Sequence, residues 1–293
     1  MPAVFVLIWS TGFVVARYGM PYAPPLSFLC LRYALSMLAF AVWLALARPC
    51  WPQRREQWLH LAVTGVFMHA GYLGGVWMAV KGGLSAGMAA LIVGLQPVLT
   101  ALWLSSRQGA SHVSRTQWLG LVLGLAGLLM VVWRKLGAGE VTGWTLTLGV
   151  LALLSITTGT LYQKRFVAPT DVRAANFIQL LGAIIVSLPF ALLESEPVQF
   201  EPQMLAALAW SVGVLTLGGS SLLFILIQRG AATQVSSLMY LVPPCTALMA
   251  WFLFGENLSL LVVAGFVLTA AGVALVVRRP ARSPNEPIES NKT

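Results

Sequence analysis

The sequence contains few charged residues, and none of its long apolar runs contains an acidic one. Only 9% of the 293 residues are Asp, Glu, Lys or Arg, and 58% are hydrophobic. A soluble globular domain carries about 25% charged residues, so an ordinary soluble protein is excluded. Coupled carriers commonly use a buried carboxylate, and its absence from the runs argues against a carboxylate relay.

Motifs for catalysis and metal binding are also missing. The three cysteines, Cys30, Cys50 and Cys245, are far apart in the sequence and odd in number. They predict neither a disulfide framework nor a metal site. No Walker, HExxH or GxSxG motif occurs. We therefore predict that the protein is not an enzyme and uses no cofactor and no metal.

Long apolar runs make up most of the chain. A run of at least 18 residues without charge is a candidate transmembrane helix. Such runs occupy 57–80, 82–106, 116–133, 141–163, 174–193, 202–228, 230–255 and 257–277. Two further spans precede them at 2–17 and 26–47. These runs predict an all-α integral membrane protein with ten transmembrane helices.

The net charge of +9 is distributed as the positive-inside rule expects. With the N-terminus inside, the inner loops and tail hold Arg48, Arg54, Arg55, Arg107, Arg115, Lys164, Arg165, Arg173, Arg229, Arg278, Arg279, Arg282 and Lys292. The outer loops hold only Arg17, Lys81, Arg134 and Lys135. We therefore expect both termini to be cytoplasmic in a multi-pass protein of a bacterial-type inner membrane. The excess charge reflects topology, and nucleic acid is not an expected partner.

The chain also repeats itself at a nearly constant shift of 145–147 residues. Matched pairs include Gly71 with Gly218, Pro97 with Pro243, Gly120 with Gly265, and Arg134 with Arg279. Each copy holds five helices, an odd number, so the second copy must enter the membrane in the opposite orientation. We predict inverted repeats at 1–134 and 143–279, followed by a disordered cytoplasmic tail at 280–293. Inverted repeats are typical of transporters, with the substrate near the midplane.

Two similar proline motifs lie inside the apolar runs. Residues 95–102 read LQPVLTAL and residues 241–248 read LVPPCTAL. Pro97, Pro243 and Pro244 should each break a helix and free a carbonyl group. Such a break is either a packed kink or a hinge that shapes a cavity, and we predict that these three prolines gate access. The glycine-rich last helix of each repeat is predicted to be scaffold or a dimer contact.

Polar residues inside the runs are the candidate site. Arg32 is the only interior charge, and we expect it either to orient its helix through backbone carbonyls or to meet the solute. His69 is either a packing residue or a cavity wall and proton relay. The predicted cavity residues are Trp9, Thr11, His69, Tyr72, Trp77, Gln96, Thr158, Tyr162 and Tyr240.

Several motifs, taken in order, resemble the EamA family of the drug/metabolite transporter superfamily. They are VFVLIWSTGFVVARYG near the start, FLCLRYALS in the second run, YLVPPCTALMAWFLFGE at 240–256, and the glycine-spaced closing helices. The resemblance covers about residues 1–279. The positions matching family motifs are Trp9, Arg32, Pro97, Pro243, Gly255 and Glu256. The first repeat departs from the pattern, because Gly109-Ala110 stands where Gly255-Glu256 would correspond.

The resemblance implies a bundle of two inverted repeats around a central cavity, with alternating access and, often, export of amino acids or related metabolites. We therefore predict a secondary transporter that exports small metabolites, foremost amino acids or related compounds. The expected partners are a small solute and the lipid bilayer, and the protein is a monomer or a homodimer. Open alternatives are a facilitator or exchanger of another solute, a receptor or scaffold subunit without transport, and a flippase of lipid or sugar intermediates.

Overall fold

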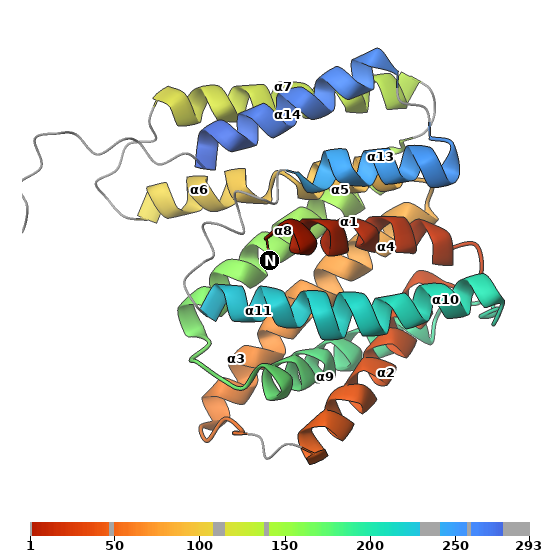
Figure 1. The fold of residues 1–293 in the computed structure, drawn as a ribbon, viewed down its shortest axis with the longest axis vertical. Helices are drawn as coiled ribbons and strands as arrows, with labels where there is room; N and C mark the ends of the chain where they lie inside the picture. Colours follow the sequence, from red (N-terminus) through yellow and green to blue (C-terminus); the bar gives the residue numbers. More distant parts are fainter. Residues whose placement is uncertain are drawn as a thin grey trace, which may run out of the picture.

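The fold is that of a computed structural model, which describes residues 2–46, 50–107, 115–137, 141–228, 241–256 and 259–277 (Figure 1). Within these ranges every regular element is a helix. The prediction of an all-α protein is therefore confirmed.

The first half runs from α1 to α7. Its elements are α1 (Pro2–Gly19), α2 (Pro25–Leu46), α3 (Arg55–Gly65), η1 (Val66–Gly71), α4 (Tyr72–Lys81), α5 (Ala86–Val93), α6 (Gln96–Arg107) and α7 (Arg115–Gly137). The second half contains α8 (Gly143–Phe166), α9 (Val172–Ala191), α10 (Pro202–Trp210), η2 (Ser211–Ser220), α11 (Ser221–Gln228), α13 (Val242–Phe254) and α14 (Leu260–Val277). The elements η1 and η2 are π-helical segments inside longer rods.

Several of the described helices have the length and apolarity that a bilayer requires. Five could cross a membrane by length and composition: Pro25–Leu46, Arg55–Lys81, Gly143–Phe166, Val172–Ala191 and Pro202–Leu226. Five shorter apolar helices accompany them: Val4–Gly19, Ala86–Thr100, Trp118–Trp133, Val242–Phe254 and Leu260–Leu275. These segments fall on the runs predicted from the sequence.

The helices of the two halves pack against each other in matching pairs. The element α2 contacts α9, α5 contacts α13, and α7 contacts α14. The remaining pairs are crossed, since α1 packs against α10 and η2 while η1 and α4 pack against α8. The protein core therefore lies between the halves and not within each half.

The contact between α7 and α14 forms one edge of the molecule (Figure 1). Glycines let the two backbones approach closely. A β-carbon on Gly127 would lie 2.5 Å from the carbonyl oxygen of Gly265. The Thr269 hydroxyl donates to the Gly124 carbonyl at 3.4 Å. The glycine pattern of these helices thus serves a contact within the chain.

At one end of the bundle, two partly buried carboxylates of the second half cap helices of the first half. Glu194 follows α9, and its carboxylate accepts hydrogen bonds from the backbone N–H groups of Leu26 at 3.0 Å and Ser27 at 2.8 Å. These N–H groups lie at the start of α2, where a helix has no internal partners for them and where negative charge is favourable.

Glu256 makes the second of these links, just after α13. Its carboxylate accepts from the backbone N–H of Ala86 at 3.2 Å, at the start of α5. It also forms an ion pair with Arg17 in the last turn of α1. The Arg17 guanidinium lies 5.1 Å from the ring centre of Phe254. One carboxylate therefore joins α1, α5 and α13 at the same end.

Candidate functional site

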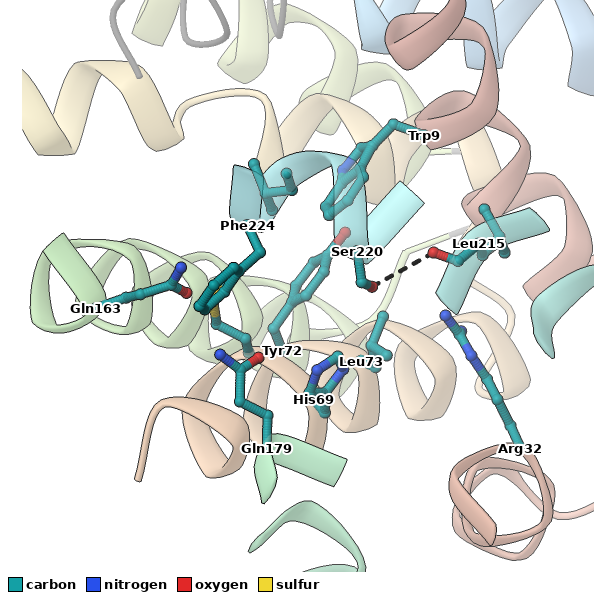
Figure 2. A pocket seen from close by; sticks show the side chains of 12 residues that line it. Trp9, Arg32, His69, Tyr72, Leu73, Gln163, Gln179, Leu215, Ser220 and Phe224 are labelled. Carbon is teal, nitrogen blue, oxygen red and sulfur yellow. Dashed lines mark hydrogen bonds between the residues drawn. The ribbon is translucent and has the colours of Figure 1, made fainter. Parts of the chain in front are cut away.

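A small buried cavity lies where the two halves meet (Figure 2). Its volume is about 50 Å³, enough for a few water molecules. It is lined by Trp9, Arg32, Met68, His69, Tyr72, Leu73, Gln163, Gln179, Leu215, Ser220, Leu223 and Phe224. Residues of both halves thus line one cavity, whose mostly apolar wall carries several polar side chains.

Both π-helical segments reach this cavity. His69 comes from η1, and Leu215 and Ser220 come from η2. A π segment interrupts the regular helical ladder and occurs frequently at functional sites. In η2 the Thr216 hydroxyl donates to the carbonyl of Ser211 at 2.9 Å, five residues back. The Ser220 hydroxyl likewise donates to the carbonyl of Leu215 at 3.4 Å, also five residues back.

Arg32 brings a positive charge to the cavity. Its side chain projects from α2 into the bundle, and the residue is only 4% exposed. The guanidinium Nε donates to the Thr216 hydroxyl at 3.0 Å. Among the described residues, no carboxylate pairs with it and no other side chain accepts a hydrogen bond from it. A buried charge without a partner is costly, and we expected backbone carbonyls to supply one. The structure instead ties the guanidinium to a hydroxyl of η2.

Two glutamine side chains in the cavity wall also have unused hydrogen-bonding capacity. Gln163 in α8 is 3% exposed and Gln179 in α9 is 4% exposed. The amide nitrogen of each has no hydrogen-bond partner within the described part of the chain. Buried polar atoms are usually hydrogen-bonded, and exceptions mark functional positions or unseen ligands.

His69 and Tyr72 form the floor of the cavity below Trp9 (Figure 2). The hydroxyl of Tyr33 in α2 donates to the His69 carbonyl at 2.9 Å, which fixes the position of η1. Gln179 lies beside the His69 ring, and the Tyr72 hydroxyl faces Trp9. Trp9 itself is packed on Phe5, with ring centres 5.2 Å apart.

Five other described residues that were predicted for the cavity lie outside it, and Thr11 and Trp77 are two of them. The Thr11 hydroxyl donates to the Ile8 carbonyl at 2.6 Å and accepts from the Trp210 indole at 2.9 Å. Trp77 is 1% exposed and stacks on Phe28 with ring centres 4.5 Å apart. Both side chains are occupied in helix packing.

The Gln96 side chain joins the two halves at another place. Its amide donates to the Thr160 hydroxyl in α8 at 3.0 Å. The hydroxyl of Thr160 in turn donates to the Ile156 carbonyl at 2.7 Å. Gln96 therefore ties the start of α6 to α8, outside the cavity of Figure 2.

Thr158 and Tyr162 line a second, larger and mostly apolar hollow between α6 and α8. Its volume is about 780 Å³, and Leu99, Leu102, Trp103, Leu154, Thr157, Leu161, Arg165 and Phe166 complete its wall. The Tyr162 hydroxyl is 2.8 Å from the Nδ1 atom of His60. The predicted residues thus divide between two hollows, while Tyr240 lies outside the described residues.

The prolines occupy helix starts and not helix interiors, which corrects our expectation of two kinked helices. The helix that contains Pro97 ends at Val93 and restarts at Gln96, so the proline lies in a first turn, where its missing N–H costs nothing. Pro243 and Pro244 likewise lie in the first turn of α13.

The two proline motifs meet in space. A β-carbon on Gly94, in the turn between α5 and α6, would lie 2.6 Å from Cγ of Pro243. The two helix starts therefore pack directly on each other, with α5 and α13 in contact. The internal sequence match at these positions corresponds to a structural contact.

Comparisons with known proteins agree with this architecture. The model of the EamA-like transporter family matches residues 3–133 and 143–278. The chain belongs to the EamA-like transporter family. It is therefore a membrane transporter and not an enzyme, as the sequence predicted.

Its EamA-like relatives are similar over nearly their whole length. A "Probable amino-acid metabolite efflux pump" of Salmonella typhimurium is 27% identical over 94% of this chain and 95% of its own. An "Uncharacterized inner membrane transporter YedA" of Escherichia coli is 27% identical over 96% of this chain and 94% of its own. A solved crystal structure with 17% identity covers 93% of this chain and 94% of that chain at a TM-score of 0.66, which shows a shared fold.

Sequence reasoning missed the two glutamines, Gln163 and Gln179, and the hydroxyl of Thr216. The glutamines were detectable as amides inside apolar helices, like Gln96, which was selected. The position of Thr216 depends on the wider π turn of η2, and no residue pattern in the sequence indicated that turn.

Proposed function

We propose that this protein is a secondary transporter of the inner membrane that exports amino acids or related small metabolites by alternating access. The observation that carries the proposal is the cavity of Figure 2, buried at the contact of the two halves and lined by both π segments. Small-solute sites of transporters lie at such contacts between repeats. The name of the Salmonella typhimurium relative supports the substrate class.

The proposal includes ten spans arranged as two inverted repeats, with both termini in the cytoplasm. The pairing of α2 with α9, α5 with α13 and α7 with α14, together with the crossed contacts of α1 and α8, is the pattern expected of two halves related by a two-fold axis. The lysine and arginine distribution supports the orientation.

The proposed cycle opens and closes the two ends of the bundle in turn. The ion pair between Arg17 and Glu256, with the cap on Ala86, closes the end where α1 and α13 finish. In the proposed orientation this end is periplasmic. Solute would enter from the cytoplasmic side, and the ion pair would separate before release.

Flux measured with purified protein in proteoliposomes tests the proposal. Labelled amino acids are offered with and without a pH gradient, and empty vesicles give the background. We expect saturable flux above background. Flux that occurs only with a gradient would identify proton coupling, and His69→Gln would then be the first variant. A failure to move any amino acid or related metabolite would overturn the substrate assignment.

A further inference from the structure

We infer that the cavity binds a carboxylate group of the solute and that Arg32 is its anchor. The inference rests on the proposed function, because it names the chemical group by which the proposed solute is recognised. It goes beyond that function because it names Arg32 as the anchor and a negatively charged carboxylate as the group that the anchor binds.

The charge balance of the cavity is the first argument. Arg32 lies deep in the bundle with one hydrogen bond, from Nε to Thr216, and the described residues offer its terminal N–H groups no acceptor. A buried guanidinium in this state is destabilising until an anion reaches it. A carboxylate matches its planar donor fork in two parallel hydrogen bonds.

The neutral polar groups of the cavity point to the same ligand. The amide nitrogens of Gln163 and Gln179 are buried in the wall without partners. Each can donate hydrogen bonds. Figure 2 shows both amides across the cavity from Arg32, so they can donate to a second electron-rich group of the same solute, and none of the lining residues is acidic.

The rest of the cavity wall constrains what is attached to the carboxylate. Met68, Leu73, Leu215, Leu223 and Phe224 make much of the wall apolar. This wall matches a solute with a short apolar chain, and the cavity must widen from its present volume of about 50 Å³ to admit one. An ammonium group would meet hydroxyl and amide oxygens and the aromatic faces of Trp9 and Tyr72, and each of these neutral groups attracts a cation more weakly than a carboxylate does. The carboxylate can thus belong to an apolar amino acid or to a simple carboxylic acid.

Thermal unfolding of the purified protein with matched ligand pairs tests the inference. The probes are L-leucine against L-leucinamide, and 4-methylpentanoate against 4-methylpentanamide, each at the same ionic strength. We expect the carboxylates to raise the unfolding temperature because they bind only the folded state. The amides, which lack the charge, should raise it little. A shift with leucine alone indicates an amino acid, and a shift with both acids indicates a carboxylic-acid site.

The variant Arg32→Gln should abolish the shift, and Arg32→Lys should keep part of it, since the charge remains but the fork is lost. Arg54→Gln is the matched control, because Arg54 is exposed before α3, and it should keep the full shift. Without ligand, Arg32→Gln should unfold at the same temperature as the wild type or higher, because an unpaired buried charge is removed. If Arg32 had only a structural role, Arg32→Gln would unfold at a lower temperature than the wild type. Gln179→Met keeps Arg32 but removes a buried amide donor, so the acids should raise the unfolding temperature less than in the wild type. This variant tests the site if Arg32→Gln does not fold.

Competition in the proteoliposome assay separates this inference from the proposed function. We expect each amide to compete with labelled amino acids at least about tenfold less well than its acid. Equal competition would overturn the carboxylate site and leave the transport function standing. If the acids raise the unfolding temperature only when Arg32 is present, and no flux is detected, the result would support the carboxylate site and count against transport. The absence of any difference between acids and amides in both assays would overturn the inference.

Discussion

The closest approach of two helices beside the cavity leads to a sharp prediction for Gly65→Ala. Gly65 ends α3 and lies against α9, and a β-carbon there would overlap the carbonyl oxygen of Gln179 and lie 2.5 Å from the carbonyl carbon and Cα of that residue. Ordinary contact begins at 3.4 Å, so the backbones would have to separate by more than about 1 Å. Because the obstacle is backbone, no rotamer change can relieve it.

The expected loss of stability follows from two opposing terms. Overpacking at such a contact costs about 3 kcal/mol, and alanine in place of glycine returns up to about 1 kcal/mol of helix propensity. We expect Gly65→Ala to lose about 2 kcal/mol, measured as a lower unfolding temperature of the purified protein in detergent. Flux should fall as well, because Gln179 moves with α9.

Gly74→Ala is the matched control in the same long rod. A β-carbon at Gly74 would lie 3.6 Å from Cδ2 of Leu26, which is ordinary contact. This variant should be as stable as the wild type or up to about 1 kcal/mol more stable. If Gly65→Ala and Gly74→Ala unfold at the same temperature, the packing argument for α3 and α9 is refuted.

Four other variants test different parts of the structure. Pro97→Ala and Pro243→Ala should lower transport more than surface abundance, and an equal loss of both quantities would leave the prolines a folding role only. Glu256→Gln removes the ion pair with Arg17 and should weaken the closed end of the bundle. Labelled solute trapped in proteoliposomes should then escape faster than with the wild type. Unchanged leakage would contradict a gating role. For Asp171→Asn, the relevant contact is with Arg173, whose side-chain hydrogen bonds lower the pKa of Asp171. The Asp171 carboxylate therefore stabilises the folded protein above its unfolded-state pKa of about 3.9. This stabilisation is lost as the pH falls from about 3.9 through the lower pKa of the folded state. Unfolding temperatures measured from pH 7 to pH 3 should therefore fall more steeply for the wild type than for Asp171→Asn, and parallel curves would count against the pair.

The positions of the helices could be predicted because hydrophobicity is a local property. The runs at 57–80, 174–193 and 202–228 match the helices of the structure closely. A helix that crosses a bilayer needs about 20 mostly apolar residues, and this requirement is visible in the sequence. The break before Pro97 was also predicted, while the residues before the second proline motif lie outside the described part of the chain. What the sequence could not indicate was that each proline begins a helix, because the preceding turn depends on the contact between Gly94 and Pro243.

The candidate site was predictable only in part. Trp9, His69, Tyr72 and Arg32 were selected and do share one cavity. Trp77 was selected by the same reasoning and is fully packed in the core. A helix with apolar residues on every face does not reveal which face meets a cavity, because all of its faces are covered by protein or lipid.

The sequence by itself determined the class of the protein. Its scarcity of charge, its ten apolar runs, its internal repeat and its EamA-like motifs identify a helical membrane transporter, because these properties follow from local composition and order. The tertiary structure decided which side chains come together. It set Arg32 on Thr216, placed Gln163 and Gln179 in the same wall, and aligned the two π segments across the cavity. The contact between Arg32 and Thr216 joins residues that are 184 positions apart, and only the packing of one half against the other brings them within reach.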